Sequence, residues 1–182
     1  MLVFDETISG YRYYYPLAQC GINCSAEFTV MGKAIANGYS LAAVLIDKKI
    51  IDKINLKEVY EFSTTHAGES VGLSAAISTL QFYKSYSVVD NINQKGAFLK
   101  QKMNNIISDH GLQEHISLAG MPTYFRVCFS ASHLNEAFCK FLFEHSVLCR
   151  GIISVCYSHS HDDLNHFADL FNLFCEELLM EI

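Results

Sequence analysis

The sequence predicts an α/β protein of two domains, and three observations support this. The apolar run Leu2–Phe4 ends in acidic Asp5, as buried parallel strands often do. A long segment beginning at Ser70 carries apolar residues at helical spacing. The remaining chain alternates strand, strand, helix, strand and helix, which is typical of a small α+β layer with helices on one face. We place the boundary inside the long helical segment, so that residues 1–95 form one domain and residues 96–182 a second.

Predicted elements of the first domain follow from short apolar runs and the breaks between them. A buried central strand needs neighbours on both sides, so the place of Leu2–Phe4 at the start predicts that the chain is the C-terminal part of a larger protein or of its ancestor. The pattern then predicts an aromatic-rich loop at 9–16, strands at 29–31 and 41–46, a helix at 48–54 capped by Asp47, and a polar loop at 62–68.

The second domain begins within the helical segment, which breaks near 86–90 and ends at His110-Gly111, where glycine is a favourable C-cap. Beyond it we predict strands at 116–121 and 123–129 about Pro122, a helix opened by Ser132 and strand material within 147–157. Asp162-Asp163 opens a last amphipathic helix.

Bulk composition excludes several classes of function. The net charge of −6, with no basic block among 182 residues, argues against binding to a phosphate backbone. The longest apolar runs, such as Leu41–Ile46, are far too short to cross a bilayer. Seven cysteines are an odd number at irregular spacing within apolar segments. This pattern favours free thiols in a reduced, cytoplasmic protein over a set of disulfide bonds.

Lys33 stands alone in the apolar, small-residue segment Phe28–Ile46. Such a lysine is either a surface residue that extends its amine into water or a poorly solvated reactive amine. Asp5 at a strand end and the pair Thr64-Thr65 before a helix favour the second interpretation. A lysine amine, a carboxylate and hydroxyls near a helix start are the groups that pyridoxal phosphate chemistry requires.

At these positions the sequence resembles the C-terminal half of class III pyridoxal-phosphate aminotransferases, which have fold type I, and within them glutamate-1-semialdehyde aminomutases. The resemblance rests on the segments Leu2–Arg12, Met31–Ala43 and Thr65–Gly68 with Ala75-Ala76 and Leu80, and on the spacing between them. It implies that residues 1–95 are the remainder of the large, cofactor-binding domain and residues 96–182 the small domain.

The resemblance also assigns roles to four residues. Lys33 would be the catalytic lysine that forms the Schiff base and shuttles a proton, and Asp5 would pair with the pyridine nitrogen. Thr65 would bind the cofactor phosphate across a dimer interface. Thr7 falls where the family usually has a valine against the cofactor ring. Asn37 replaces a usual glycine.

The family places about half of its fold before the Asp5 strand, so we expect little turnover from this chain alone. The expected reaction is amino transfer or amino exchange between a small amino donor and a carbonyl acceptor, in a homodimer or with a complementing N-terminal fragment. The alternative is a truncated or split-gene fragment that dimerises or complements without catalysis. We expect no nucleic-acid or membrane partner.

Other polar groups have simpler interpretations. Glu6 is expected to have a structural role. Because Thr64 precedes Thr65 directly, a one-residue shift in the match to the family would assign the phosphate-binding role to Thr64 instead of Thr65. Arg126 and Arg150 are expected at the surface, although either could hold a carboxylate. Cys156, His159 and His161 are reminiscent of a metal site but lack a fourth ligand at a diagnostic spacing, so we predict no metal.

Overall fold

The computed structural model describes residues 1–53 and 65–181. The chain divides into two compact units, Met1–Val89 and Asp90–Ile182. The sequence predicted this boundary between residues 95 and 96, which is slightly later in the chain than the observed one and lies inside the helix α4 (Val88–Asp109). Each unit has its own cluster of buried apolar side chains.

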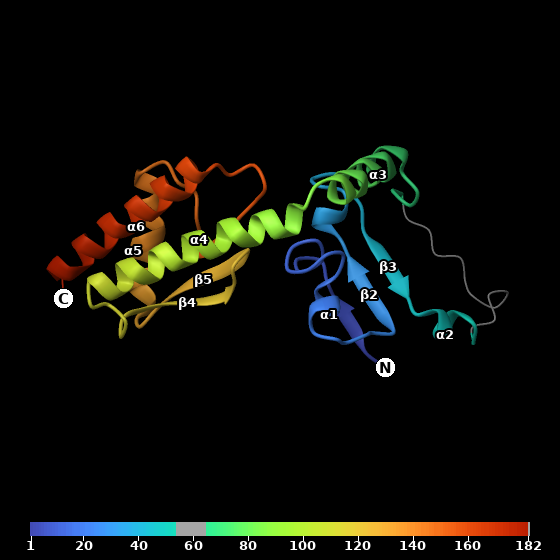
Figure 1. The fold of residues 1–182 in the computed structure, drawn as a ribbon, viewed down its shortest axis with the longest axis horizontal. Coiled ribbons are helices and arrows are strands. Elements are labelled where there is room, and N and C mark those ends of the chain that lie inside the picture. Colours follow the sequence, from blue (N-terminus) through green and yellow to red (C-terminus); the bar gives the residue numbers. More distant parts are fainter. Residues whose placement is uncertain (54–64, 182) are drawn as a thin grey trace. The chain divides into compact units, whose positions relative to one another are not determined.

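The first unit contains a sheet in the order β1-β2-β3 (Figure 1). Its strands lie where the apolar runs predict them: β1 (Val3–Asp5), β2 (Phe28–Met31) and β3 (Ala43–Ile46). β1 runs parallel to β2, with Asp5 opposite Val30, and β3 runs antiparallel to β2. The prediction of parallel pairing for the first strand is therefore correct.

The first strand, β1, is less buried than the sequence predicts. Val3 is 53% exposed, and Phe4 is only partly buried. β1 is an edge strand, since among the described strands only β2 pairs with it. The expectation of a buried strand is wrong for this chain, because an edge strand leaves one side and its backbone groups open.

Helical elements of the first unit place the segment around Lys33. They are α1 (Ala18–Gly21), the 3-10 turn η1 (Lys33–Ile35), α2 (Lys48–Ile51) and α3 (Ser70–Ser85). Asp47 caps α2 as predicted, because its Oδ1 accepts the Lys49 backbone N–H at 2.7 Å; Ile54, the predicted end of this helix, lies outside the described residues. Ala76 of α3 packs with Ile35 and Ala36 in a small core that holds η1 against the helix.

The second unit has the predicted order of elements (Figure 1). After α4 come β4 (Ile116–Met121), β5 (Tyr124–Phe129), α5 (Ser132–Glu144), β6 (Ile152–Ser154) and α6 (His161–Glu181). The strands form an antiparallel sheet in the order β4-β5-β6. Gly111 follows α4 with a φ of 67°, the left-handed conformation expected of a C-cap glycine.

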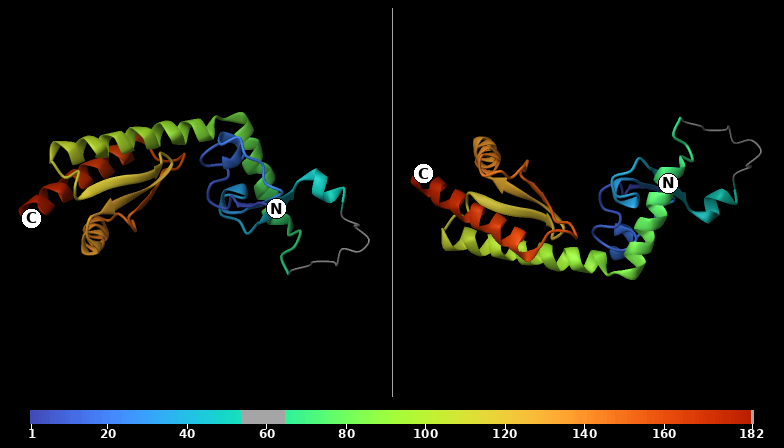
Figure 2. Two further views of the ribbon diagram at one scale, coloured as in Figure 1. Left: turned by 90° about the horizontal axis from the view of Figure 1, so that it is seen from below. Right: turned by 90° about the horizontal axis from the view of Figure 1, so that it is seen from above.

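Helices cover one face of this second sheet. Phe125, Val127 and Ile153 are buried, whereas their neighbours along the strands are more exposed, so burial alternates with the period of a strand. Figure 2 shows α4 and α6 running side by side. Phe138 of α5 and Phe174 of α6 meet with ring centroids 5.0 Å apart, and both contact Phe129 of the sheet. Burying each such ring contributes about 1.5–3 kcal/mol.

Among the described residues, no helix combines the length and the hydropathy needed to cross a membrane.

Candidate functional site

Parallel pairing brings the first two candidate residues to one edge of the sheet. β1 ends at Asp5 and β2 ends at Met31, so the residues that follow both strands emerge at the same carboxyl edge. Thr7 and Lys33 meet there: the Lys33 amine Nζ donates to Thr7 Oγ1 at 3.5 Å. The geometry therefore joins two segments that are far apart in the sequence.

Asp5 is held in a turn by Thr7. The Thr7 backbone N–H donates to Asp5 Oδ1 at 2.9 Å. This hydrogen bond, a second one from the Thr7 hydroxyl and the positive charge of Lys33 hold the pKa of the Asp5 carboxyl below its usual value of 3.8. The carboxyl is thus ionised at neutral pH, next to a lysine amine.

Lys33 has a left-handed backbone conformation, with a φ of 45°. This conformation costs a non-glycine residue about 1–2 kcal/mol. Two hydrogen bonds compensate, because the Lys33 carbonyl accepts the N–H groups of Ala36 and Asn37 at 3.3 and 3.1 Å. The side chain is exposed. The expectation of a poorly solvated amine is therefore wrong for this chain, in which the ammonium group reaches water.

Asn37 also adopts the left-handed conformation, with a φ of 46°. It stands where the resembling family usually has a glycine. Asparagine tolerates this region better than other side chains, because its short amide bonds locally. The replacement is thus compatible with the turn after Lys33.

Glu6 anchors the loop that follows β1. It is only 3% exposed, and its carboxylate accepts hydrogen bonds from Ser9 Oγ at 2.9 Å, from the Ala18 N–H at 2.8 Å and from the Gln19 N–H at 2.9 Å. These contacts tie loop residues to the strand end that carries Asp5 and Thr7. The structural role expected for Glu6 agrees with this arrangement.

Sequence reasoning missed the partners of Glu6. Gln19 Nε2 donates to Thr29 Oγ1 at 2.8 Å, and Gln19 Oε1 accepts the Ala26 N–H at 3.0 Å. Both Gln19 and Thr29 are buried. The polar Thr29 inside an apolar strand was the one available signal, because a buried hydroxyl requires a partner.

Thr65 lies in an exposed turn at residues 65–68, immediately before α3. The alternative residue, Thr64, lies outside the described residues. The next helix begins with its own cap: the Glu69 carboxylate accepts the N–H groups of Val71 and Gly72 at 2.8 and 2.7 Å. The structure therefore brings together Asp5, Thr7 and Lys33, and places Thr65 at the approach to a helix N-terminus.

The remaining candidates lie in the second unit. Arg126 and Arg150 are both exposed. In the parts of the chain that the structure describes, no three histidine, cysteine or acidic side chains gather as metal ligands. All seven cysteines are free thiols.

With this geometry in view, comparison with known proteins gives a clear result. The model of the aminotransferase class-III family matches residues 1–159.

The chain belongs to the class-III aminotransferase family.

Individual relatives agree with this assignment. A glutamate-1-semialdehyde 2,1-aminomutase of Methanothrix thermoacetophila is 30% identical over 129 residues, which are 71% of this chain and 29% of the relative. A 3-aminobutyryl-CoA aminotransferase of Cloacimonas acidaminovorans is 26% identical over 93% of this chain and 42% of its own length. The chain thus spans less than half the length of these curated relatives.

Solved structures show the fold. A transaminase with bound pyridoxal phosphate matches with a TM-score of 0.86 at 22% identity, over 99% of this chain and 45% of its own. The FumI protein of Sphingopyxis sp. MTA144, in its internal aldimine form with that cofactor, matches with a TM-score of 0.88 at 19% identity, over 99% and 44%. The prediction of a partial fold type I transferase is confirmed. The expected cofactor, pyridoxal 5′-phosphate, is the one named for both structures.

The residues of the site fit this cofactor chemically. Lys33 supplies a solvent-accessible amine, Asp5 a carboxylate kept ionised by Thr7, and Thr7 a methyl and a hydroxyl beside the amine. Asp5 and Lys33 are both exposed, so a molecule in solution can reach them. An aldehyde, a basic ring nitrogen and an aromatic face each have a matching protein group here.

Proposed function

We propose that this chain carries the lysine and the electronic partner of a pyridoxal-phosphate enzyme that transfers or exchanges amino groups between small molecules. The observation that carries the proposal is the meeting of Asp5, Thr7 and Lys33 at one sheet edge. Membership in the class-III aminotransferase family supports it.

Each of the three residues has a distinct role in the proposal. Bound pyridoxal phosphate supplies an aldehyde that condenses with amines and a ring that withdraws electrons when its nitrogen is protonated. Lys33 Nζ would hold the cofactor through its amine and would move a proton to and from the substrate carbon as a general base and acid. The Asp5 carboxylate would pair with the protonated ring nitrogen. The Thr7 methyl would pack against the ring.

Thr65 is proposed to bind the cofactor phosphate, with its turn just before α3 providing backbone N–H groups as further donors. In this proposal Thr65 acts across the interface of a homodimer. Amino donor and carbonyl acceptor are small molecules, and the protein acts in the cytoplasm, which suits its seven free thiols.

Turnover by this polypeptide alone is proposed to be low. Water reaches both Asp5 and Lys33, and exclusion of water is one of the ways an active site strengthens electrostatic contacts.

A specific observation also favours the second candidate function, a subunit that dimerises or complements another fragment. The first unit exposes large apolar side chains on its strands and on α3: Val3, Val44, Leu45, Val71 and Ile77.

The experiment that tests the first proposal is reduction with borohydride after addition of pyridoxal phosphate. We expect one phosphopyridoxyl group on Lys33, located by peptide mass spectrometry, and its loss in the variant Lys33→Ala. Lys49→Ala, which removes an exposed lysine of α2, is the matched control and should keep the label. Labelling spread evenly over the lysines would contradict a dedicated site at Lys33.

Activity and self-association separate the two candidate functions. Steady transamination by the chain alone, lost in Lys33→Ala, would overturn the proposal of low turnover. Sedimentation velocity tests the complementing role. A chain that remains monomeric at high concentration, and that gains no activity when mixed with the N-terminal half of an active relative, would contradict it.

A further inference from the structure

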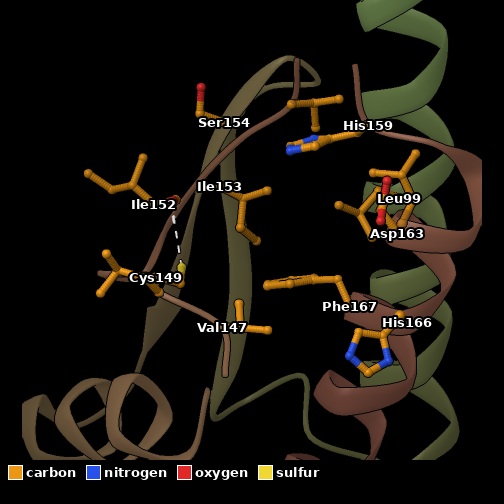
Figure 3. Close-up of a pocket in the computed structure, with 13 residues that line it drawn as sticks. Leu99, Val147, Cys149, Ile152, Ile153, Ser154, His159, Asp163, His166 and Phe167 are labelled. Atoms are coloured by element: carbon orange, nitrogen blue, oxygen red, sulfur yellow. Dashed lines mark hydrogen bonds between the residues drawn. The ribbon is translucent and has the colours of Figure 1, made fainter. Parts of the chain in front are cut away.

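The second unit contains a pocket of about 330 Å³ that the amino-transfer proposal does not use (Figure 3). It lies between the strand side, with Val147, Cys149 and Ile153, and the helix side, with Leu99 and Phe167. Pockets that bind small molecules span roughly 300–1,000 Å³ and are mostly apolar with a few placed polar groups. This one is at the lower end of that range and has the same mixed lining.

Two of its polar groups are already committed to the protein. Asp163 Oδ2 accepts the backbone N–H and the hydroxyl of Ser160, each at 2.7 Å, and so caps the start of α6. The Cys149 thiol donates to the Ile152 carbonyl at 3.6 Å, the dashed line in Figure 3. Neither group is set up to bind a ligand without losing an internal contact.

His159 is different. Its Nδ1 accepts the Cys156 backbone N–H at 3.3 Å. A nitrogen that accepts carries no proton, so in the neutral ring the proton is on Nε2, which is then a donor. Figure 3 shows the imidazole reaching from the helix side over Ile153, with the Phe167 ring extending below it toward Val147. The pocket thus has the His159 N–H donor in its lining, above an apolar floor, with His166 and Ser154 as its other polar neighbours.

Charge limits what could bind beside this donor. Hydrogen bonds from Ser160, together with the positive charge that His159 and His166 can carry, hold the pKa of the Asp163 carboxyl below its usual value of 3.8, so it is ionised at neutral pH. The Asp163 carboxylate is already satisfied by Ser160, and an ion of either sign would lose its hydration among the apolar side chains of the pocket. A neutral molecule avoids this cost.

We infer that this pocket binds a small neutral molecule with an apolar body and one carbonyl oxygen, which accepts a hydrogen bond from His159 Nε2 while the body packs on Phe167 and Ile153. The site is contained in the second unit and does not depend on Lys33 or on pyridoxal phosphate.

The test uses the whole chain without added cofactor and two probes of matched shape. N,N-dimethylbenzamide carries the carbonyl, and isobutylbenzene is the hydrocarbon of the same branching; an amide does not condense with lysine, so Lys33 is not engaged. Alkylation of Cys149 by iodoacetamide reports occupancy, because this thiol lines the pocket. Mildly alkaline buffer is needed, since burial raises the pKa of the Cys149 thiol. Cys128, which does not line the pocket, is the internal control.

We expect the amide to slow alkylation of Cys149 about tenfold at ten times its dissociation constant and to leave Cys128 unchanged. The amide should bind at least about fivefold more tightly than the hydrocarbon, the value of one hydrogen bond. His159→Phe should abolish this preference, and His159→Gln, which keeps an N–H donor, should restore part of it.

The inference would be overturned if Cys149 reacts at the same rate with and without the amide, if Cys128 is slowed equally, or if His159→Phe retains the preference for the amide. Circular dichroism and the Cys128 rate establish that each variant is folded. If both probes protect Cys149 equally in the natural sequence, the carbonyl contact to His159 is refuted.

Discussion

The Lys33 amine lies 3.5 Å from the hydroxyl oxygen of Thr7, a residue that precedes it by 26 positions. Thr7 also donates its backbone N–H to Asp5. One threonine thus links the proposed cofactor lysine to the proposed ring partner. The link uses both the hydroxyl and the backbone N–H of Thr7.

Replacing Asp5 with Asn is expected to weaken the binding of pyridoxal phosphate and to leave the fold intact. The amide oxygen of asparagine can still accept the Thr7 N–H, but a neutral side chain cannot pair with a protonated ring nitrogen. The dissociation constant should rise about tenfold or more, measured by absorbance titration. Asp52→Asn, at the exposed end of α2, serves as the control. Equal affinity in Asp5→Asn and the natural sequence would refute the proposed pairing.

Glu6→Ala should destabilise the first unit. The change leaves the N–H groups of Ala18 and Gln19 and the Ser9 hydroxyl without their buried acceptor. Loss of hydrogen bonds to a buried charge should lower the free energy of unfolding by about 2–4 kcal/mol, measured by urea denaturation. The exposed Asp52→Asn should change it by less than about 0.5 kcal/mol. An equally small effect of Glu6→Ala would show that the loop does not depend on this carboxylate.

Gly96→Ala should destabilise the second unit even though alanine favours helices. A Cβ at position 96 would collide with the backbone carbonyl of Pro122, which cannot move aside as a side chain can. Alanine gains about 1 kcal/mol of helix propensity, and the forced backbone shift costs about 1–3 kcal/mol or more. Thermal unfolding should therefore occur at a lower temperature. Gln101→Ala, at an exposed position of the same helix, should be neutral or slightly stabilising; a stabilising Gly96→Ala would contradict the close packing.

Glu69 makes the start of α3 sensitive to acid. Hydrogen bonds from the N–H groups of Gly72 and Val71 hold the pKa of this carboxyl below its usual value of 4.5 in the folded chain. The cap therefore stabilises α3 fully above pH 4.5 and loses this effect as the pH falls through the lower pKa of the folded state. Glu69→Gln should lower the urea midpoint at neutral pH, with the difference disappearing in acid. Glu136→Gln, exposed on α5, should show no such pH-dependent difference.

Cys175 is expected to resist alkylation in the folded chain. Burial, with a smaller effect of the neighbouring Glu176 charge, raises the pKa of its thiol to about 12. The thiolate is the nucleophile, so iodoacetamide at about pH 8 should modify exposed Cys20 and spare Cys175. In concentrated urea both should react at similar rates. Modification of Cys175 in the native chain at the rate of Cys20 would contradict its burial.

Much of the local structure follows from the order of residues alone. Asp47 and Gly111 mark the ends of elements where capping and turn chemistry predict them. The strand–strand–helix–strand–helix order of the second unit follows from hydrophobic periodicity, because the period of burial differs between a strand and a helix. The segments around Asp5 and Lys33 also carry enough of a family pattern to predict the fold type and the cofactor.

Other features required the folded chain. The sequence predicted a buried first strand and a poorly solvated lysine, yet β1 is an open edge and Lys33 is exposed. Burial depends on what packs against a residue, and the apolar character of a short segment does not specify a neighbour. The contacts of Glu6 and Gln19 also depend on the tertiary structure, because Gln19 reaches Thr29 only when a loop folds back onto β2.

The sequence by itself therefore determined the elements, the family and the residue types of the candidate site, because these depend on local spacing and chemistry. Only the tertiary structure decided that Thr7 stands between Asp5 and Lys33, that Gly96 must remain small against Pro122 and that His159 lines an apolar pocket. Each of these is a distance between segments separated in the chain, and such distances are set by strand pairing and side-chain packing.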